Sequence, residues 1–136
     1  MRISPHLTYS GECRAAFEFY RELLGGSLQL LTYGESPAAD HVSADWHSKI
    51  VHATLSVVNG MELAGADVQP DEYEKAQGFY VLLQVDDLPE AQRMFDALSQ
   101  DGEVRMPLQE TFWSVGYGIL VDRFGTPWEI SCAQDP

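Results

Sequence analysis

Two stretches of the chain carry apolar residues at helical spacing, and each is followed by a turn sequence. The first covers residues 13–24 and precedes Gly25-Gly26. The second covers residues 88–99, has Pro89 in its first turn and precedes Asp101-Gly102. We therefore predict one helix in each half of the chain.

Shorter apolar runs around these helices predict strands. The clearest alternation covers residues 49–58, where the odd-numbered positions are mostly apolar and His52, Thr54 and Ser56 form the polar side. Asn59-Gly60 then predicts a hairpin turn. The predicted strands are residues 3–10, 28–33, 49–58, 61–64, 80–85, 103–109, 113–121 and 127–132.

The order of elements repeats, which indicates an internal duplication. An offset of 75 pairs Ala16 with Ala91 and Tyr20 with Phe95. The fold class is α+β, with two tandem β-α-β-β-β modules forming a curved mixed sheet around a concave cavity. We predict one domain, with module one at 1–66, a linker at 67–78 and module two at 79–136.

Residues 34–48 have no clear period and predict a long surface loop. We expect this loop to be more mobile than its neighbouring strands and to cover the mouth of the cavity. His41 and His47 lie in it beside Asp40 and Asp45. A solvated loop is the favoured interpretation, and a second metal cluster is the alternative.

The composition of the chain bears on the partners that it can bind. The net charge is −13, from 21 acidic and 8 basic residues, so nucleic acid and membrane surfaces are poor partners. Cys13 and Cys132 are too far apart in sequence for a zinc or redox pair and predict buried free thiols. With no signal-peptide or membrane-span pattern, a cytoplasmic protein is expected.

One acidic residue lies among apolar neighbours in the last strand of each half. Glu62 follows Met61 and Glu129 follows Trp128. Alternation places Met61 and Trp128 on the face that the helix covers, and the glutamates on the opposite face. An acid there needs solvent or a polar cavity, so Glu62 and Glu129 are expected to approach one another across one concave face.

Several motifs together resemble the vicinal oxygen chelate superfamily, which includes glyoxalase I, extradiol dioxygenases and bleomycin-resistance proteins, and more closely its PhnB-like branch. The matching stretches cover nearly the whole chain: residues 6–13 (HLTYSGEC), 32–35 (TYGE), 51–53 (VHA), 106–113 (MPLQETFW) and 122–128 (DRFGTPW).

The resemblance implies a metal site in which each module supplies one ligand from its first strand and one glutamate from its last. Glu62 and Glu129 match the glutamates, but ungapped register places Pro5 and Tyr80 at the first-strand positions, and neither is a usual ligand. His6 would replace Pro5 only with a bulge. His52 is either a pocket-wall histidine, the favoured interpretation, or a group for metal binding or proton transfer.

Aromatic residues of the second half suggest a pocket. We assign Tyr80, Trp113 and Tyr117 to it, together with Gln109 and Thr54. For Trp113 and Tyr117 a core position is an equal alternative. Phe112 and Trp128 are expected in the core.

Two functions stay open, and the incomplete ligand set favours the first. One is a small-molecule-binding protein that lacks the inherited metal site and has no turnover. The other is an enzyme of lyase, isomerase or dioxygenase type that acts on a small oxygenated substrate with a divalent metal. Glu62 and Glu129 are candidates for an acid–base pair, which could serve catalysis or could hydrogen-bond a ligand. Cofactors are therefore none or a divalent ion, and a homodimer is expected because the modules expose sheet edges.

Overall fold

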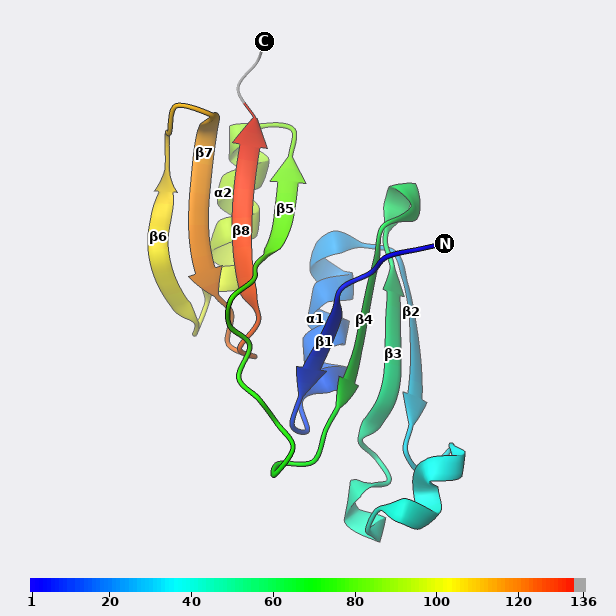
Figure 1. The fold of residues 1–136 in the computed structure, drawn as a ribbon. Coiled ribbons are helices and arrows are strands. Elements are labelled where there is room, and N and C mark those ends of the chain that lie inside the picture. The colour runs from blue at the N-terminus through cyan, green and yellow to red at the C-terminus, as the bar shows by residue number, and fades with distance from the viewer. Residues whose placement is uncertain (134–136) are drawn as a thin grey trace. The chain divides into compact units, whose positions relative to one another are not determined.

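A computed structural model describes residues 1–133, and the chain divides into two compact units, Met1–Glu74 and Lys75–Pro136. Each unit contains one helix and four strands in the order β-α-β-β-β (Figure 1). The predicted α+β class and the repeat of two modules are confirmed. Within the described residues, no helix is both long enough and apolar enough to cross a membrane.

The first unit forms a mixed sheet in the order β1-β4-β3-β2, in which only β1 and β4 run parallel. Its elements are β1 (His6–Tyr9), α1 (Cys13–Leu24), β2 (Ser27–Thr32), β3 (Ile50–Ser56) and β4 (Glu62–Asp67). Short 3-10 helices cover Pro37–His41, Ala44–Trp46 and Val58–Gly60. The predicted 34–48 loop is thus partly helical, and Asn59 makes the expected turn with a φ of 70°.

Helix α1 covers one face of this sheet. Its buried side chains are Cys13, Ala16, Phe17 and Tyr20, one stripe at helical spacing. On β4, a Cβ added to Gly65 would lie 2.6 Å from Phe17 Cε1, so this glycine lets helix and sheet approach closely. We call the face that α1 leaves uncovered the first open face.

The start of α1 is held by a residue distant in sequence. Glu12, at the N-cap, makes no capping bond with its side chain. Instead the Asp67 carboxylate accepts hydrogen bonds from the backbone N–H groups of Gly11, Cys13 and Ile50, at 2.8, 3.0 and 2.9 Å. Asp67 was expected to begin the linker. It is the last residue of β4 and 1% exposed, because its carboxylate joins α1 to β3.

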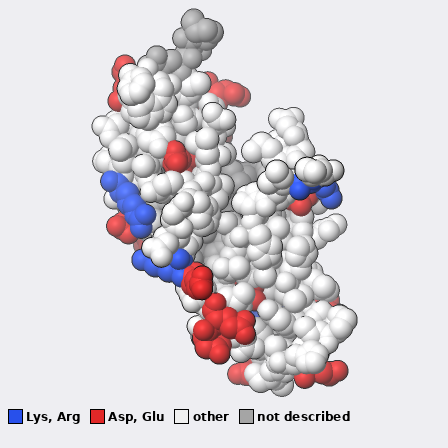
Figure 2. Space-filling model, in the orientation of Figure 1, with Lys and Arg blue, Asp and Glu red and all other residues white. Residues whose placement is uncertain are grey.

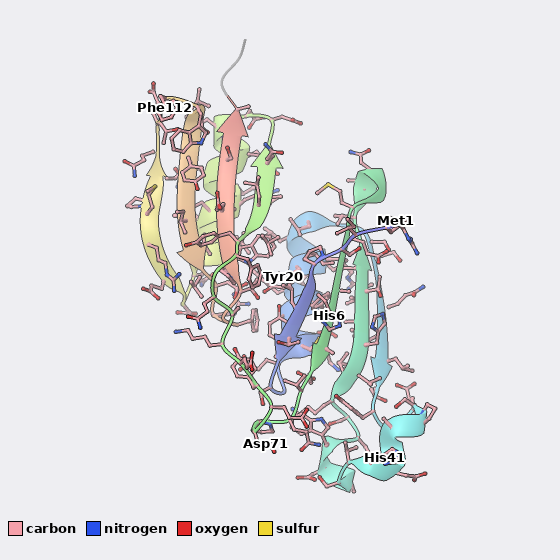
Figure 3. All side chains as sticks on the ribbon, viewed as in Figure 1. Met1, His6, Tyr20, His41, Asp71 and Phe112 are labelled. Atoms are coloured by element: carbon pink, nitrogen blue, oxygen red, sulfur yellow. The ribbon has the colours of Figure 1, made fainter. Side chains whose placement is uncertain are left out.

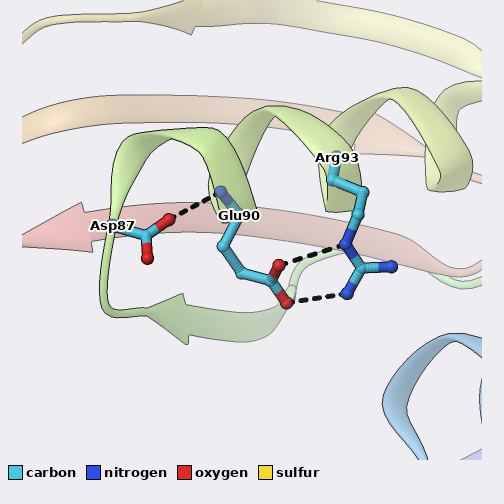
Figure 4. Close-up of polar contacts among 3 residues, drawn as sticks. All are labelled: Asp87, Glu90 and Arg93. Atoms are coloured by element: carbon cyan, nitrogen blue, oxygen red, sulfur yellow. Dashed lines mark hydrogen bonds and ion pairs between the residues drawn. The ribbon is translucent and has the colours of Figure 1, made fainter.

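The second unit repeats the sheet in the order β5-β8-β7-β6, with β5 and β8 parallel. Its elements are β5 (Val81–Val85), α2 (Leu88–Ser99), β6 (Glu103–Gln109), β7 (Ser114–Val121) and β8 (Pro127–Ala133). Helix α2 begins as the sequence predicts. Asp87 accepts a hydrogen bond from the Glu90 backbone N–H at 2.8 Å, and the Glu90 carboxylate accepts two from Arg93 (Figure 4).

Helix α2 covers the face of this sheet that carries Gly116 and Gly118. A Cβ added to Gly118 would lie 2.6 Å from Phe95 Cε2, and one added to Gly116 would lie 2.6 Å from a Leu88 methyl carbon. Because side chains alternate along a strand, Tyr117 lies on the opposite face, which we call the second open face.

The segment Asp122–Trp128, part of the motif that carried the resemblance, has a structural role. The Asp122 carboxylate accepts hydrogen bonds from the N–H groups of Phe124 and Thr126 and from the indole N–H of Trp128. It closes the turn into β8 and fixes Trp128 in the core, where that side chain was expected. Cys13 and Cys132 are buried free thiols, as predicted.

The expected core position of Phe112 is wrong. Phe112 is 90% exposed, because the Thr111 N–H donates to the Ser114 carbonyl and places Phe112 in the turn between β6 and β7 (Figure 3). Met61, which alternation places on the face that the helix covers, is 59% exposed because it precedes β4 and follows the turn at Asn59.

Candidate functional site

The second open face carries a carboxylate bonded to a phenol. Glu129 on β8 lies opposite Ile119 of β7, and Tyr117 is two residues from Ile119 along β7, on the same face. The Tyr117 hydroxyl donates a hydrogen bond of 2.5 Å to Glu129 Oε2. Both residues are candidates from the sequence, and the structure brings them together.

Tyr117 stays protonated over a wide pH range. Burial of the phenol, its hydrogen bond to Glu129, the negative charge of Glu129 and the nearby Tyr80 together raise the Tyr117 pKa to about 12. At neutral pH the hydroxyl is therefore the donor in its hydrogen bond to Glu129.

Aromatic rings adjoin this pair. The Trp113 ring lies 5.2 Å from the Tyr117 ring in an edge-to-face arrangement, and Phe112 lies 4.6 Å from Trp113. Trp113 is 49% exposed and Tyr80, directly before β5, is 40% exposed. Gln109 pairs with Tyr117 across β6 and β7. In the view of Figure 2, much of the surface over this sheet is uncharged, and both acidic and basic groups interrupt it.

The first open face carries the remaining candidates. His52 and Thr54 lie on it, with His52 Nε2 and Thr54 Oγ1 3.0 Å apart. The His6 and His52 rings are 6.5 Å apart between centroids. Glu62, at the start of β4, forms an ion pair of 3.8 Å with Arg2, a partner that sequence reasoning missed.

The face of His6 differs from the expectation. In β1 the buried positions are Leu7 and Tyr9, so His6 and Thr8 are on the open side. His6 pairs with Ala64, which shares a face with Glu62. His6 (Figure 3) therefore shares the face of Glu62 without a bulge. The ungapped alignment of Pro5 with Tyr80 fails because the turn from β5 to α2 is one residue shorter than the turn from β1 to α1.

The two glutamates occupy different positions in their strands. Glu129 pairs with Leu82 on β5, whereas Glu62 lies opposite Ser56 of β3, two residues before the β4 position that pairs with His6. Each glutamate is on the open face of its own unit. Their approach across a shared cavity stays a prediction.

We tested whether these residues fit the metal site that the family resemblance implies. The first-strand neighbour of Glu129 is Leu82, which has no donor atom, and one oxygen of Glu129 already accepts from a neutral phenol. Within residues 1–133, no three His, Cys, Asp or Glu side chains are grouped so that they could hold a metal ion. The donor set does not fit a four-ligand site.

The fold and this site define the class of protein. Residues 3–130 match the model of the Glyoxalase/Bleomycin resistance protein/Dioxygenase superfamily. The chain belongs to this superfamily, as its motifs suggested.

Three proteins are similar to this chain over nearly its whole length. The chain is 32% identical to protein YjdN of Escherichia coli over 98% of this chain and 97% of YjdN. The crystal structure of protein PA1353 from Pseudomonas aeruginosa is 43% identical, covers 99% of both chains and has a TM-score of 0.89. A PhnB protein from Bacillus cereus, described as a putative 3-demethylubiquinone-9 3-methyltransferase, shares the fold at 23% identity and a TM-score of 0.78, with 98% of this chain and 100% of that one covered.

Proposed function

We propose that this protein binds a small molecule on the second open face, beside the Tyr117–Glu129 pair. The observation that supports this most is the hydrogen bond between these two side chains next to the half-exposed Trp113 ring. A ring to stack on and an oriented carboxylate together suit a small, partly apolar ligand that carries a hydrogen-bond donor.

Metal-dependent turnover is the less favoured function. Its chemistry needs a metal with open positions, held by ligands of suitable type and geometry. The strand neighbour of Glu129 is a leucine, and the glutamate accepts its hydrogen bond from a neutral phenol. Binding needs only the groups that the second unit already presents. A cytoplasmic location and a homodimer stay predictions.

The proposal is tested with two neutral probes, benzyl alcohol and indole. For fragments of this size we expect dissociation constants of about 1–10 mM. Amide shifts in ¹⁵N–¹H spectra should concentrate on β7, β8 and the turn at Phe112. Trp113→Ala should weaken binding at least about fivefold, because it removes the stacking ring.

The matched control is Leu88→Ala. Leu88 is an apolar side chain, 46% exposed, on the α2 side of the same sheet, so its removal should leave probe affinity unchanged. Shifts that appear only in the first unit, or equal loss in both variants, would contradict the proposal.

A further inference from the structure

The Glu129 carboxylate has no cationic partner in the part of the chain that the structure describes. Two ion pairs of the described residues join Arg2 to Glu62 and Arg93 to Glu90, and neither involves Glu129. Residues 134–136 contain no lysine or arginine. A half-buried carboxylate without a cation is an unfavourable arrangement that a bound cation would relieve.

Hydrogen bonding leaves Glu129 with acceptor capacity. Tyr117 donates to Oε2, and no hydrogen bond within residues 1–133 is made to Oε1. A carboxylate accepts at two oxygens, so a donor on a ligand has a site to bond. An ammonium group would satisfy both the free oxygen and the charge, whereas a hydroxyl would satisfy only the oxygen.

The aromatic side chains near Tyr117 also favour a cationic ligand. Trp113 is partly exposed and lies edge-to-face with Tyr117, whose hydroxyl bonds the carboxylate, and indole faces attract cations more strongly than other aromatic rings do. The net charge of −13 adds a long-range attraction for cations and repels anions.

We infer that the second open face selects a cationic ligand, a small amine whose ammonium group is attached to an aromatic or flat apolar ring. This inference rests on the proposed function and specifies its ligand class. Glu129 supplies the countercharge, Tyr117 fixes the orientation of the carboxylate, and Trp113 contacts the ring. Glu129 is thus the residue that determines specificity for charge.

The experiment compares three probes that share one ring and differ in charge: benzylammonium, benzyl alcohol and benzoate. Titration calorimetry with the full chain at pH 7 and about 20 mM ionic strength gives the affinities, and ¹⁵N–¹H spectra locate the binding. We expect benzylammonium to bind about tenfold more tightly than benzyl alcohol, and benzoate to bind most weakly.

Glu129→Gln keeps the shape and an oxygen that Tyr117 can donate to, but it removes the charge. It should bring benzylammonium and benzyl alcohol within about twofold of one another. Glu90→Gln is the matched control, because it removes an equal charge from α2, on the covered side of the sheet (Figure 4). It should leave the tenfold preference in place.

Ionic strength provides a second measurement on the unmodified protein, which is informative even if Glu129→Gln misfolds. Raising it to about 0.5 M should weaken benzylammonium binding and leave benzyl alcohol unchanged. Equal binding of these two probes by the unmodified protein would overturn the charge inference and leave the proposed function standing. If none of the three probes binds, both the charge inference and the proposed function are overturned. If the preference for benzylammonium survives in Glu129→Gln, Glu129 is not its source.

Discussion

Removal of the Asp67 carboxylate should destabilise the first unit more than the loss of an ordinary helix cap. The carboxylate accepts three backbone hydrogen bonds, two of which, from Cys13 and Ile50, are buried. Asp67→Ala would leave these donors without partners. A buried orphan donor costs about 1–3 kcal/mol, so we expect a loss of about 4 kcal/mol in the free energy of unfolding. Typical domains have only about 5–15 kcal/mol in total.

Asp67→Asn should have an intermediate effect. Its amide oxygen can replace Oδ1, which accepts from both Gly11 and Cys13, but its NH₂ group would then face the Ile50 N–H. One bond is lost, at a cost of about 2 kcal/mol. For comparison, Asp87→Ala removes the single bond of a local cap on α2 and should cost about 1 kcal/mol.

Urea unfolding followed by circular dichroism measures the three free energies, and amide exchange of residues 13–24 shows whether α1 is the affected element. Asp96→Asn, an exposed change on α2, serves as control and should stay within about 0.5 kcal/mol of the unmodified protein. If Asp67→Ala costs no more than Asp87→Ala, the assignment of Asp67 as the link between α1 and β3 is refuted.

The remaining predictions concern both units. Because the folded pKa of Tyr117, about 12, exceeds its ordinary value of 10.0, its contribution to stability should be complete below pH 10 and disappear as the pH rises to 12. Tyr117→Phe should reduce that slope in alkaline unfolding curves, to which Tyr33 also contributes because burial raises its pKa, and an unchanged slope would contradict the assignment. Gly118→Ala should cost about 2–3 kcal/mol in urea unfolding, because the new methyl would meet Phe95 at 2.6 Å, whereas a cost below about 0.5 kcal/mol would show that the sheet and α2 separate easily. Protein purified without added metal should contain less than about half an equivalent of Zn, Ni, Mn or Fe by elemental analysis. Near-stoichiometric metal that survives dialysis and is lost in Glu129→Ala would contradict this prediction and favour a metal-dependent enzyme.

Local patterns in the sequence determined most of the elements. The helices at 13–24 and 88–99 were predicted from apolar spacing and from turn residues next to them, since both signals lie within a few residues of the element. The Asp87 cap and the Asn59 turn are local in the same way. The alternation of β3 was predicted correctly except at Val51, where a register shift against β2 leaves Ile50 as the buried residue.

For the candidate site, the sequence predicted the faces of the side chains but not the contact between them. Alternation along β7 and β8 indicated that Tyr117 and Glu129 point away from α2, but not that one donates to the other. That bond depends on the register between the strands, which is set by pairing of distant segments. The same dependence explains the error at His6, where a turn shortened by one residue in the second unit inverted the inferred face.

Asp67 and Asp122 show what only the tertiary structure decided. In sequence each is one acid after an apolar strand, a position that is compatible with an exposed turn. Both are buried because backbone or indole N–H groups converge on their carboxylates; for Asp67 these come from β3 and from the segment that begins α1. The sequence by itself determined which segments become helices and strands. The pairing of those segments decided which polar side chains are buried, because a charged group is stable in a protein interior only where distant donors meet it.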